Sequence, residues 1–257
     1  MNKDYIMSLA EKDVRIDGRK FDEYREVSIE TGVSMNAEGS ARCKIGDTEV
    51  IVGIKMAIGT PYPDAADEGS IVVGAELLPM SNPDFESGPP GKQAIELARI
   101  IDRGVRESKA IDFKKLCIKE GEKCWMVFID IYSINDDGNL IDAAGLATLT
   151  ALNGAKFHKL DKDDNINYKE YGDKKVELEL MPITCTFGKV NGKIIIDPNN
   201  DEESALDARL SIATFNGKVY AMQKGLDRGF TLEEIEYMID VAIAKEKELK
   251  TLIKEQK

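Results

Sequence analysis

The sequence predicts an α+β protein built from two related halves. Two blocks of short strands each precede a helical segment, and few helical segments separate neighbouring strands. This order differs from the regular strand–helix alternation that produces a doubly wound parallel sheet. A polar and charged segment at residues 155–175 lies between the two blocks. We therefore place one half at residues 1–160 and the other at residues 161–257, which ends in a long helix.

The first block opens with a short amphipathic helix, expected at residues 4–12, and a turn at Asp17-Gly18-Arg19. Residues 49–56 contain a run of β-branched apolar side chains that is typical of a buried strand. Further strands are expected at residues 27–30, 41–44 and 70–78. A proline-containing loop at residues 82–91 then separates these strands from the next helix.

Residues 93–109 show the clearest helical periodicity of the first half. At about 100° per residue, its apolar side chains share one sector; they are Ala94, Leu97, Ala98, Ile101 and Val105. Two strands are expected next, at residues 115–119 and 123–134, around a turn at Gly121. Residues 140–152 then form an Ala- and Leu-rich helix with little polar face, so we expect this helix to be buried.

The second half repeats the order of strands followed by a helix. The segment at residues 155–175 reads as an inserted loop or hairpin with a short strand at residues 155–160. Asn191-Gly192 predicts a tight hairpin turn, and Thr231 with Glu234 predicts a capping box at the start of the last helix. The strands are expected at residues 176–180, 183–190, 192–197, 209–215 and 218–223.

Composition limits the functions that the chain can have. The net charge of −12 argues against a stand-alone nucleic-acid binder, because such proteins gain affinity from basic groups that displace phosphate counterions. A single histidine, His158, and four cysteines without a C-x-x-C pair give no support to a zinc site. No apolar run approaches the roughly 20 residues of a membrane span. We expect a cytoplasmic protein with no metal, no cofactor and no membrane partner.

Three separated segments resemble ribonuclease PH-like proteins. Residues 15–19 (RIDGR) resemble the R-x-D-G-R opening of that family. Residues 82–86 (NPDFE), followed by Pro89-Pro90 and the segment 95–99 (IELAR), resemble the non-catalytic branch of the archaeal exosome. Asp197-Pro198 and the acidic segment that follows also resemble this branch. The similarity extends over roughly residues 10–245, nearly the whole chain.

The resemblance implies the ribonuclease PH-like fold, in which two related β-rich halves each carry helices packed on one side. It also implies a hexameric ring in which three copies of this chain alternate with three copies of a catalytic sister subunit. RNA-binding cap subunits would cover the ring, and single-stranded RNA would pass through its channel. The sister would use inorganic phosphate to remove nucleotides from the 3′ end of that RNA.

By this resemblance, the phosphate site of the catalytic relatives has no counterpart in this chain. Those relatives carry a Gly-Gly-(Ser/Thr)-Arg-(Ser/Thr) stretch at the start of a helix, where amides, hydroxyls and an arginine bind the anion. We match this stretch to residues 142–147 (DAAGLA), which places Leu146 at the arginine position. The resemblance therefore predicts no catalytic residue in this chain.

The acidic segment between residues 197 and 207 has two interpretations. Catalytic relatives carry acids here, for general-acid or Mg²⁺ chemistry, and Asp207 matches one of them best. The alternative is a solvated turn and helix start, where carboxylates suit the helix dipole. We favour the second interpretation, because the acids have no reaction to assist without a phosphate site. Whether Asp201 and Asp207 retain a role stays open.

Arg99, Arg103 and Arg106 form a row on the predicted helix at residues 93–109. Their spacing places them within about 60° of one another, opposite the apolar sector, where they could bind successive phosphates. The alternative is a solvated face with local ion pairs from Glu96 and Asp102. The resemblance favours RNA binding for Arg99 and Arg103, which match channel-side arginines. For Arg106 it favours neither RNA binding nor the local ion pair. Trp125, in an apolar strand, is expected in the core or at an interface, and not as a platform for base stacking.

We therefore predict a non-catalytic ring subunit that binds RNA and helps to shape the sister's active site. One alternative is an active phosphate-dependent 3′-to-5′ exoribonuclease of the same family. Another is a binding or structural protein unrelated to RNA. The RNA sequence preference, the identity of the cap and the oligomeric state of the isolated chain do not follow from the sequence.

Overall fold

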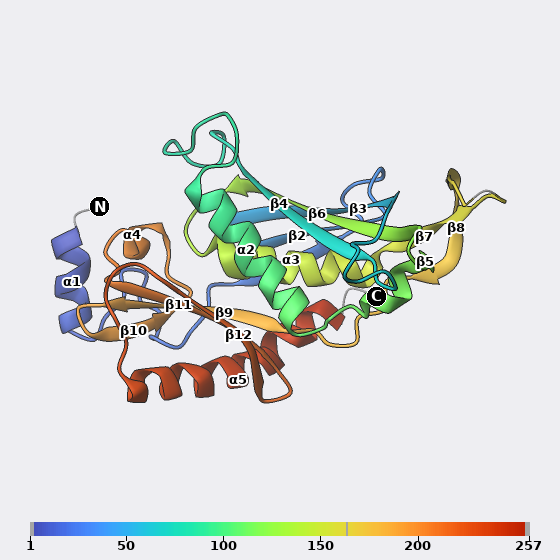
Figure 1. Ribbon diagram of the computed structural model, residues 1–257. Coiled ribbons are helices and arrows are strands. Elements are labelled where there is room, and N and C mark those ends of the chain that lie inside the picture. Colours follow the sequence, from blue (N-terminus) through green and yellow to red (C-terminus); the bar gives the residue numbers. More distant parts are fainter. Residues whose placement is uncertain (1–2, 163, 255–257) are drawn as a thin grey trace.

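A computed structural model describes residues 3–162 and 164–254, and it contains two main β-sheets (Figure 1). The larger sheet has the strand order β1-β2-β3-β6-β4, with β5 paired to β6 outside this path. Its strands are β1 Val27–Thr31, β2 Gly39–Ile45, β3 Thr48–Gly59, β4 Ser70–Leu77, β5 Cys117–Lys119 and β6 Lys123–Asn135. Most neighbours are antiparallel, but β4 runs parallel to β6, and helix α2 lies in the connection between them.

The second sheet belongs to the second half of the chain and is antiparallel throughout. Its order is β10-β9-β11-β12. Its strands are β9 Ile183–Val190, β10 Lys193–Ile196, β11 Ala208–Phe215 and β12 Lys218–Gly225. A separate hairpin of β7 Lys156–Leu160 and β8 Ile166–Lys175 occupies the polar segment between the two sheets in sequence.

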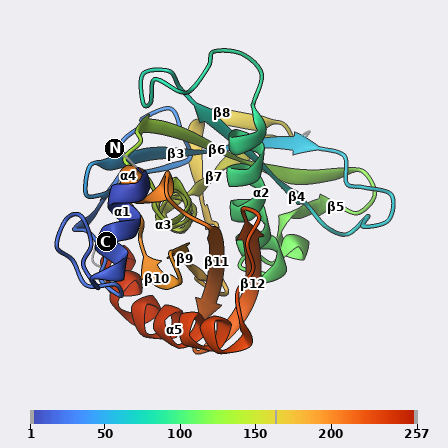
Figure 2. The ribbon, with the colours of Figure 1, turned by 90° about the vertical axis from the view of Figure 1, so that its left-hand side faces the viewer.

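The helices form layers with these sheets. They are α1 Lys3–Glu11, α2 Lys92–Glu107, α3 Leu140–Gly154, α4 Asn200–Glu203 and α5 Leu232–Lys254, and Phe113–Leu116 is a 3₁₀ turn. Helix α3 contacts β2 and β3 of the first sheet and β9 of the second, so it lies between the sheets (Figure 2). Helix α5 covers β9 and β11 from the other side. The predicted α+β fold with two β-rich halves is confirmed.

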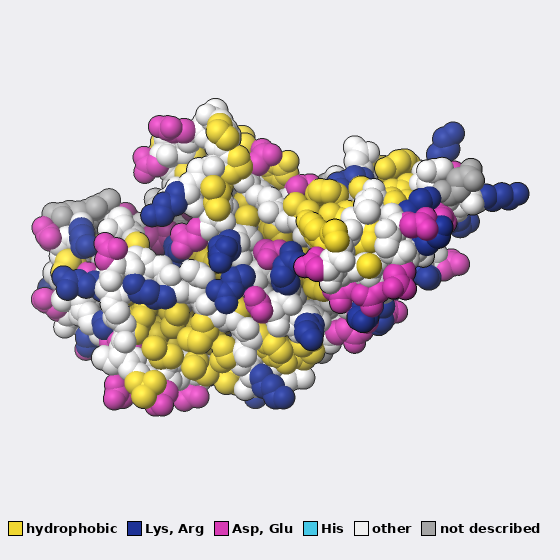
Figure 3. Space-filling model, viewed as in Figure 1, with side chains coloured by type: hydrophobic (Ala, Val, Ile, Leu, Met, Phe, Trp, Pro, Cys, Tyr) yellow, Lys and Arg dark blue, Asp and Glu magenta, His cyan; other side chains and the backbone are white. Residues whose placement is uncertain are grey.

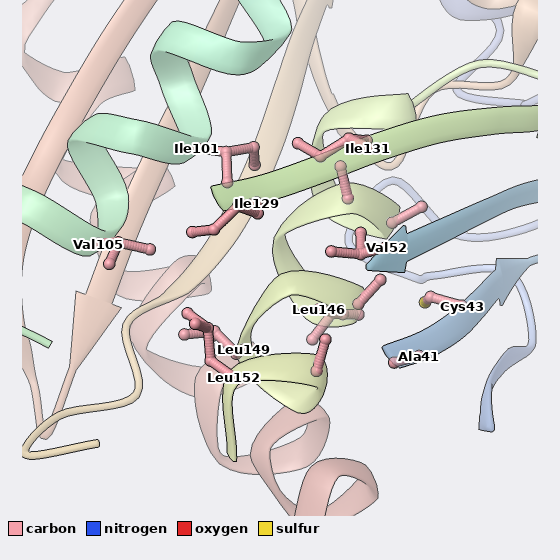
Figure 4. Packing of buried hydrophobic residues seen from close by; sticks show 14 of the residues in the cluster. Ala41, Cys43, Val52, Ile101, Val105, Ile129, Ile131, Leu146, Leu149 and Leu152 are labelled. Atoms are coloured by element: carbon pink, nitrogen blue, oxygen red, sulfur yellow. The ribbon is translucent and has the colours of Figure 1, made fainter. Parts of the chain in front are cut away.

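The position of α3 explains its apolar sequence. All residues from Ile141 to Leu152 are buried, since two sheets and helix α2 surround the helix. Figure 4 shows its leucines packed among side chains of other elements, such as Val52 of β3, Ile101 of α2 and Ile129 of β6. The approach to β2 is close: a Cβ atom at Gly39 would collide with the carbonyl oxygen of Ala151. Only glycine therefore fits there.

Most predicted elements are found, with one clear exception. Residues 176–180 were expected to form a strand, but they make a single isolated bridge between Leu178 and Ile111. Their amides bond to separate segments: that of Val176 donates to Ala155 and that of Glu179 to Ala110. Pro182 follows closely and lacks the N–H that a longer ladder would need. The segment is therefore a connection between the hairpin β7–β8 and β9.

The boundary expected between residues 160 and 161 falls at the end of β7, inside the hairpin β7–β8. The division into halves at this residue stays a prediction. Within the described residues, no helix is both long enough and apolar enough to cross a bilayer.

Candidate RNA-binding face and the start of helix α3

Helix α2 presents the predicted arginines on its outer face, and each has a different environment. Arg99 is exposed, and its side chain makes no hydrogen bond or ion pair to the part of the chain that the structure describes. Lys92, in the first turn of the same helix, is exposed as well. Figure 3 shows basic side chains over this helix, with acidic ones between them. Arg99 is thus a guanidinium free to bind a ligand.

Arg103 is half-buried and oriented by the second half of the chain. Its Nη1 donates to Oε1 of Gln223, on β12, at 3.2 Å. One bond of this kind leaves most of the guanidinium donors unused. The edge of the second sheet therefore positions Arg103 next to Arg99, one turn further along the helix.

Arg106 is engaged within the protein. Its guanidinium makes a two-pronged ion pair with Asp102, at 3.0 and 2.7 Å, and donates to the carbonyl of Ile71 at 3.2 Å. It also lies 5.7 Å from the centre of the Phe113 ring. Of the two expected local ion pairs, the one to Asp102 is therefore present. The one between Glu96 and Arg99 is not, because Glu96 pairs with Arg209.

Helix α3 starts at the residue that the sequence predicts. Helix α3 begins at Leu140, with Asn139 as its N-cap residue in the left-handed region. Residues 143–147 lie inside the helix and are buried, so Leu146 is a core residue and not part of a helix start. The residues that occupy the helix start are Gly138, Asn139 and Leu140, which offer neither a cation nor a hydroxyl.

A carboxylate of the protein itself occupies this helix start. The amide of Asn139 donates to Oε1 of Glu203 at 2.8 Å. Burial raises the pKa of Glu203 to about 7, although its bond from Asn139 acts in the opposite direction. A neighbouring cavity of about 80 Å³ is lined by Asp136, Glu96 and Glu203, among others, with Arg209 as its cation. These acidic groups make the helix start unfavourable for a multiply charged anion.

The predicted acidic segment joins a buried network between the two halves. Asp197 is fully buried and accepts hydrogen bonds from Arg19, Arg25 and Asn139, at 2.7–2.9 Å. Although burial opposes it, the guanidinium of Arg25 holds the pKa of Asp197 below its usual value. Asp197 is therefore a structural charge with no access to solvent.

Arg15, the first residue of the R-x-D-G-R segment, is held inside the same network. Its guanidinium bonds to both carboxylate oxygens of Glu202, at 2.9 and 2.6 Å, and to the carbonyls of Ile196 and Asp197. Arg15 is 3% exposed and Glu202 is 2% exposed. In the sequence this segment indicates only a family resemblance; in the structure Arg15 attaches the N-terminal arm to the second half, a role that no local pattern predicted.

Asp142 links helix α3 to the second sheet. Its carboxylate accepts four hydrogen bonds, from the hydroxyls of Tyr24 and Thr186, the amide of Thr186 and the side chain of Asn139. Burial nevertheless raises its pKa to about 6. Asp207 accepts the amide of Asn191 and so stabilises the turn between β9 and β10. Asp207 therefore has a structural partner, but the acidic segment is not the solvated turn of the second interpretation, because Asp197 and Glu202 are buried.

The remaining candidates are also structural. Trp125 is buried and packs on Phe157, with ring centres 5.1 Å apart, as expected. His158 is buried against the carboxylate of Glu38 at 3.1 Å and stacks on Tyr171 at 4.3 Å. Within the described ranges, no group of three or more histidine, cysteine or acidic side chains has the arrangement of a metal site.

Comparisons with known proteins agree with this architecture. The first domain of the 3′ exoribonuclease family matches residues 23–158, and its second domain matches residues 181–245. A Methanocella arvoryzae protein named exosome complex component Rrp42 is 48% identical, over 96% of this chain and 92% of its own length. A Thermococcus gammatolerans protein of the same name is 45% identical, over 98% and 94%.

Solved structures show the same relationship. One described as the Archaeoglobus fulgidus exosome with RNA bound to the active site contains a chain that is 43% identical, with a TM-score of 0.90 over 97% of this chain and 96% of that one. Another, an archaeal exosome core, has 40% identity and a TM-score of 0.87, over 98% and 96%. This chain belongs to the 3′ exoribonuclease family, the family of ribonuclease PH, and lies close to its archaeal Rrp42 members.

Proposed function

We propose that this chain is a ring subunit of an archaeal exosome that binds RNA and lacks a phosphorolytic site of its own. In the ring it alternates with a catalytic sister of the same family, under RNA-binding cap subunits. Its place of action is the cytoplasm. The relatives named as exosome components, and the exosome structures that resemble this chain along nearly its whole length, support membership of such a complex.

The acidic start of helix α3 carries the claim that the chain has no phosphorolytic site. Phosphorolysis needs an anion held by amides, hydroxyls and a cation. Here the amide of Asn139 is already bonded to Glu203, and two further carboxylates line the cavity beside it. An incoming phosphate would meet like charge where it needs donors. The alternative of an active enzyme is therefore disfavoured.

The isolated chain is expected to release no nucleoside diphosphate from oligoadenylate in the presence of inorganic phosphate. Loss of a single transition-state donor costs about 100- to 1000-fold, and the missing cation and hydroxyls are several such groups. The assay measures the amount of labelled nucleoside diphosphate that is released, and the assembled ring is the positive control. Activity comparable to the ring's, in the size-exclusion fraction of this chain, would support the active-enzyme alternative.

The RNA-binding part of the proposal depends on helix α2. The guanidinium of Arg99 is free of partners within the ranges that the structure describes, and Gln223 orients Arg103 beside it, so two adjacent cations project from one rigid surface. A guanidinium suits phosphate because its donors form a planar fork. Arg106 belongs to the same proposed row, but its ion pair with Asp102 reduces what it can contribute. The net charge of −12 is tolerable if other subunits supply much of the channel's field.

Mixing the chain with a catalytic sister is expected to give a closed ring with three copies of each. Among the described residues, the second sheet ends at β12, and the apolar side chains of Val219 on this strand and Leu226 just after it are exposed. Such edges and patches are usually covered by a partner. Native mass spectrometry of the mixture, with each chain alone as the control, reports the composition. Separate monomers at every salt and protein concentration would contradict the ring.

A further inference from the structure

Two of the four cysteines lie opposite each other on neighbouring strands. Cys117 on β5 and Cys124 on β6 are Cα partners in an antiparallel pair. Partners in such a pair are about 4.5–5.5 Å apart and project their side chains from the same face. A disulfide requires a Cα separation of about 4.4–6.8 Å. The backbone therefore holds these two residues at a distance that a disulfide can span.

The two thiols differ in how easily a reagent can reach them. Cys117 is half-buried, whereas Cys124 is fully buried beside the sulfur of Met126, at 4.0 Å. Burial raises the pKa of the Cys124 thiol, and the nearby charge of Cys117 raises it further. An oxidant would therefore react first at Cys117, with Cys124 held behind it as the second thiol.

The other two cysteines have no such partner. Cys43 on β2 pairs with Ile29 and Val50, and Cys185 on β9 pairs with Ile212. Both are fully buried, and burial raises the pKa of each thiol. They belong to different sheets, with helix α3 between them. Oxidation should consequently be confined to Cys117 and Cys124.

We propose that Cys117 and Cys124 are a redox modification site that forms a reversible cross-strand disulfide on contact with a peroxide. The Cys117 sulfur attacks hydrogen peroxide: an S–O bond forms, the O–O bond breaks, and hydroxide leaves and takes up the thiol proton as water. The Cys124 sulfur then attacks Cys117: the S–S bond forms, the S–O bond breaks, and a second water leaves. Two thiols are oxidised and one peroxide is reduced.

The disulfide would stiffen one end of the molecule. Strand β5 makes few ladder pairs with β6, and its register shifts between Cys117 and Lys119. A covalent link there closes the turn at Gly121 and fixes β6 just before Trp125, which packs on Phe157 of β7. The β5–β6 and β7–β8 hairpins lie together at this end (Figure 1). The site goes beyond the proposed RNA-binding function and does not depend on it.

Tryptic mapping of the whole chain without reductant tests the disulfide directly. Trypsin cleaves after Lys115, Lys119 and Lys123, so the peptides 116–119 and 124–156 separate unless a disulfide joins them. After peroxide treatment we expect the joined pair, lighter than the sum by two hydrogens, and its separation by reductant. Alkylation under denaturing conditions should then label only Cys43 and Cys185. Backbone amide exchange should slow in β5.

Matched variants give the controls. Cys117→Ser and Cys124→Ser should each abolish the joined peptides, while Cys43→Ala should leave them unchanged. The wild-type result stands by itself if a variant fails to fold. Four alkylatable thiols after peroxide treatment, a disulfide between another pair, or over-oxidised Cys117 without a link to Cys124 would each overturn the proposal.

Discussion

Replacing Arg15 with Met is expected to lower the free energy of unfolding by about 3–5 kcal/mol. The cause is the carboxylate of Glu202, which is 2% exposed and would remain charged and buried without its main cation. The carbonyls of Ile196 and Asp197 would lose a donor as well. Urea unfolding at neutral pH, followed by circular dichroism, measures the change. The contacts between the N-terminal arm and the second half should be weakened most.

A double variant separates the charge effect from the loss of packing. Arg15→Met combined with Glu202→Gln should recover part of the loss, since no uncompensated carboxylate then remains. Lys119→Met is the matched control, because it breaks an ion pair with Glu122 whose side chains are 58% and 60% exposed. An exposed pair contributes at most about 1 kcal/mol. Equal losses for Arg15→Met and Lys119→Met would show that the buried pair is not a structural clamp.

The local sequence patterns predicted most of the fold. A run of β-branched residues identified β3, the strands β9 and β11 were also expected, and the capping box of Thr231 and Glu234 is present at α5. These signals depend on residues close together in sequence, so a single chain is enough to see them. The buried helix α3 was recognisable because it lacks a polar face.

Local patterns gave no information about contacts between distant residues. Residues 176–180 alternate like a strand, yet no neighbouring strand is available over their length. Arg15 and Glu202 are 187 positions apart, so nothing near either residue indicates their ion pair. The start of α3 at Leu140 was predicted, but the bond from the amide of Asn139 to Glu203 was not, because it joins residues 64 positions apart.

The structure also changes how much each of the three predicted arginines is expected to contribute to RNA binding. Spacing alone treated Arg99, Arg103 and Arg106 as one row. The partners found for Arg103 and Arg106, Gln223 and Asp102, leave Arg99 as the free guanidinium of the three within the described residues. The proposed RNA contacts should therefore be graded, with Arg99 and Arg103 stronger than Arg106.

Changing Arg99 and Arg103 together to Gln is expected to weaken binding of single-stranded oligoadenylate to the assembled ring by about 10- to 100-fold at low salt. Each guanidinium would lose a hydrogen-bonded contact to a phosphate, at a net cost of about 0.7–1.4 kcal/mol, which lies within the range of a typical hydrogen bond. The slope of log affinity against log salt should fall by about 1.4, or 0.7 for each lost phosphate contact. Degradation by the ring should slow as well, although no catalytic group has changed.

Arg106→Gln provides the graded comparison, since the Asp102 ion pair already occupies that guanidinium and its removal should weaken RNA binding less. Thermal unfolding of the double variant should match the wild type, because Arg99 has no partner among the described residues and Arg103 loses one bond to Gln223. Native mass spectrometry must show an intact ring before RNA is added. If the double variant then binds and degrades RNA like the wild type at low and moderate salt, this face of α2 does not contact RNA. That result would not contradict the proposal that the chain is a ring subunit, because native mass spectrometry measures assembly separately.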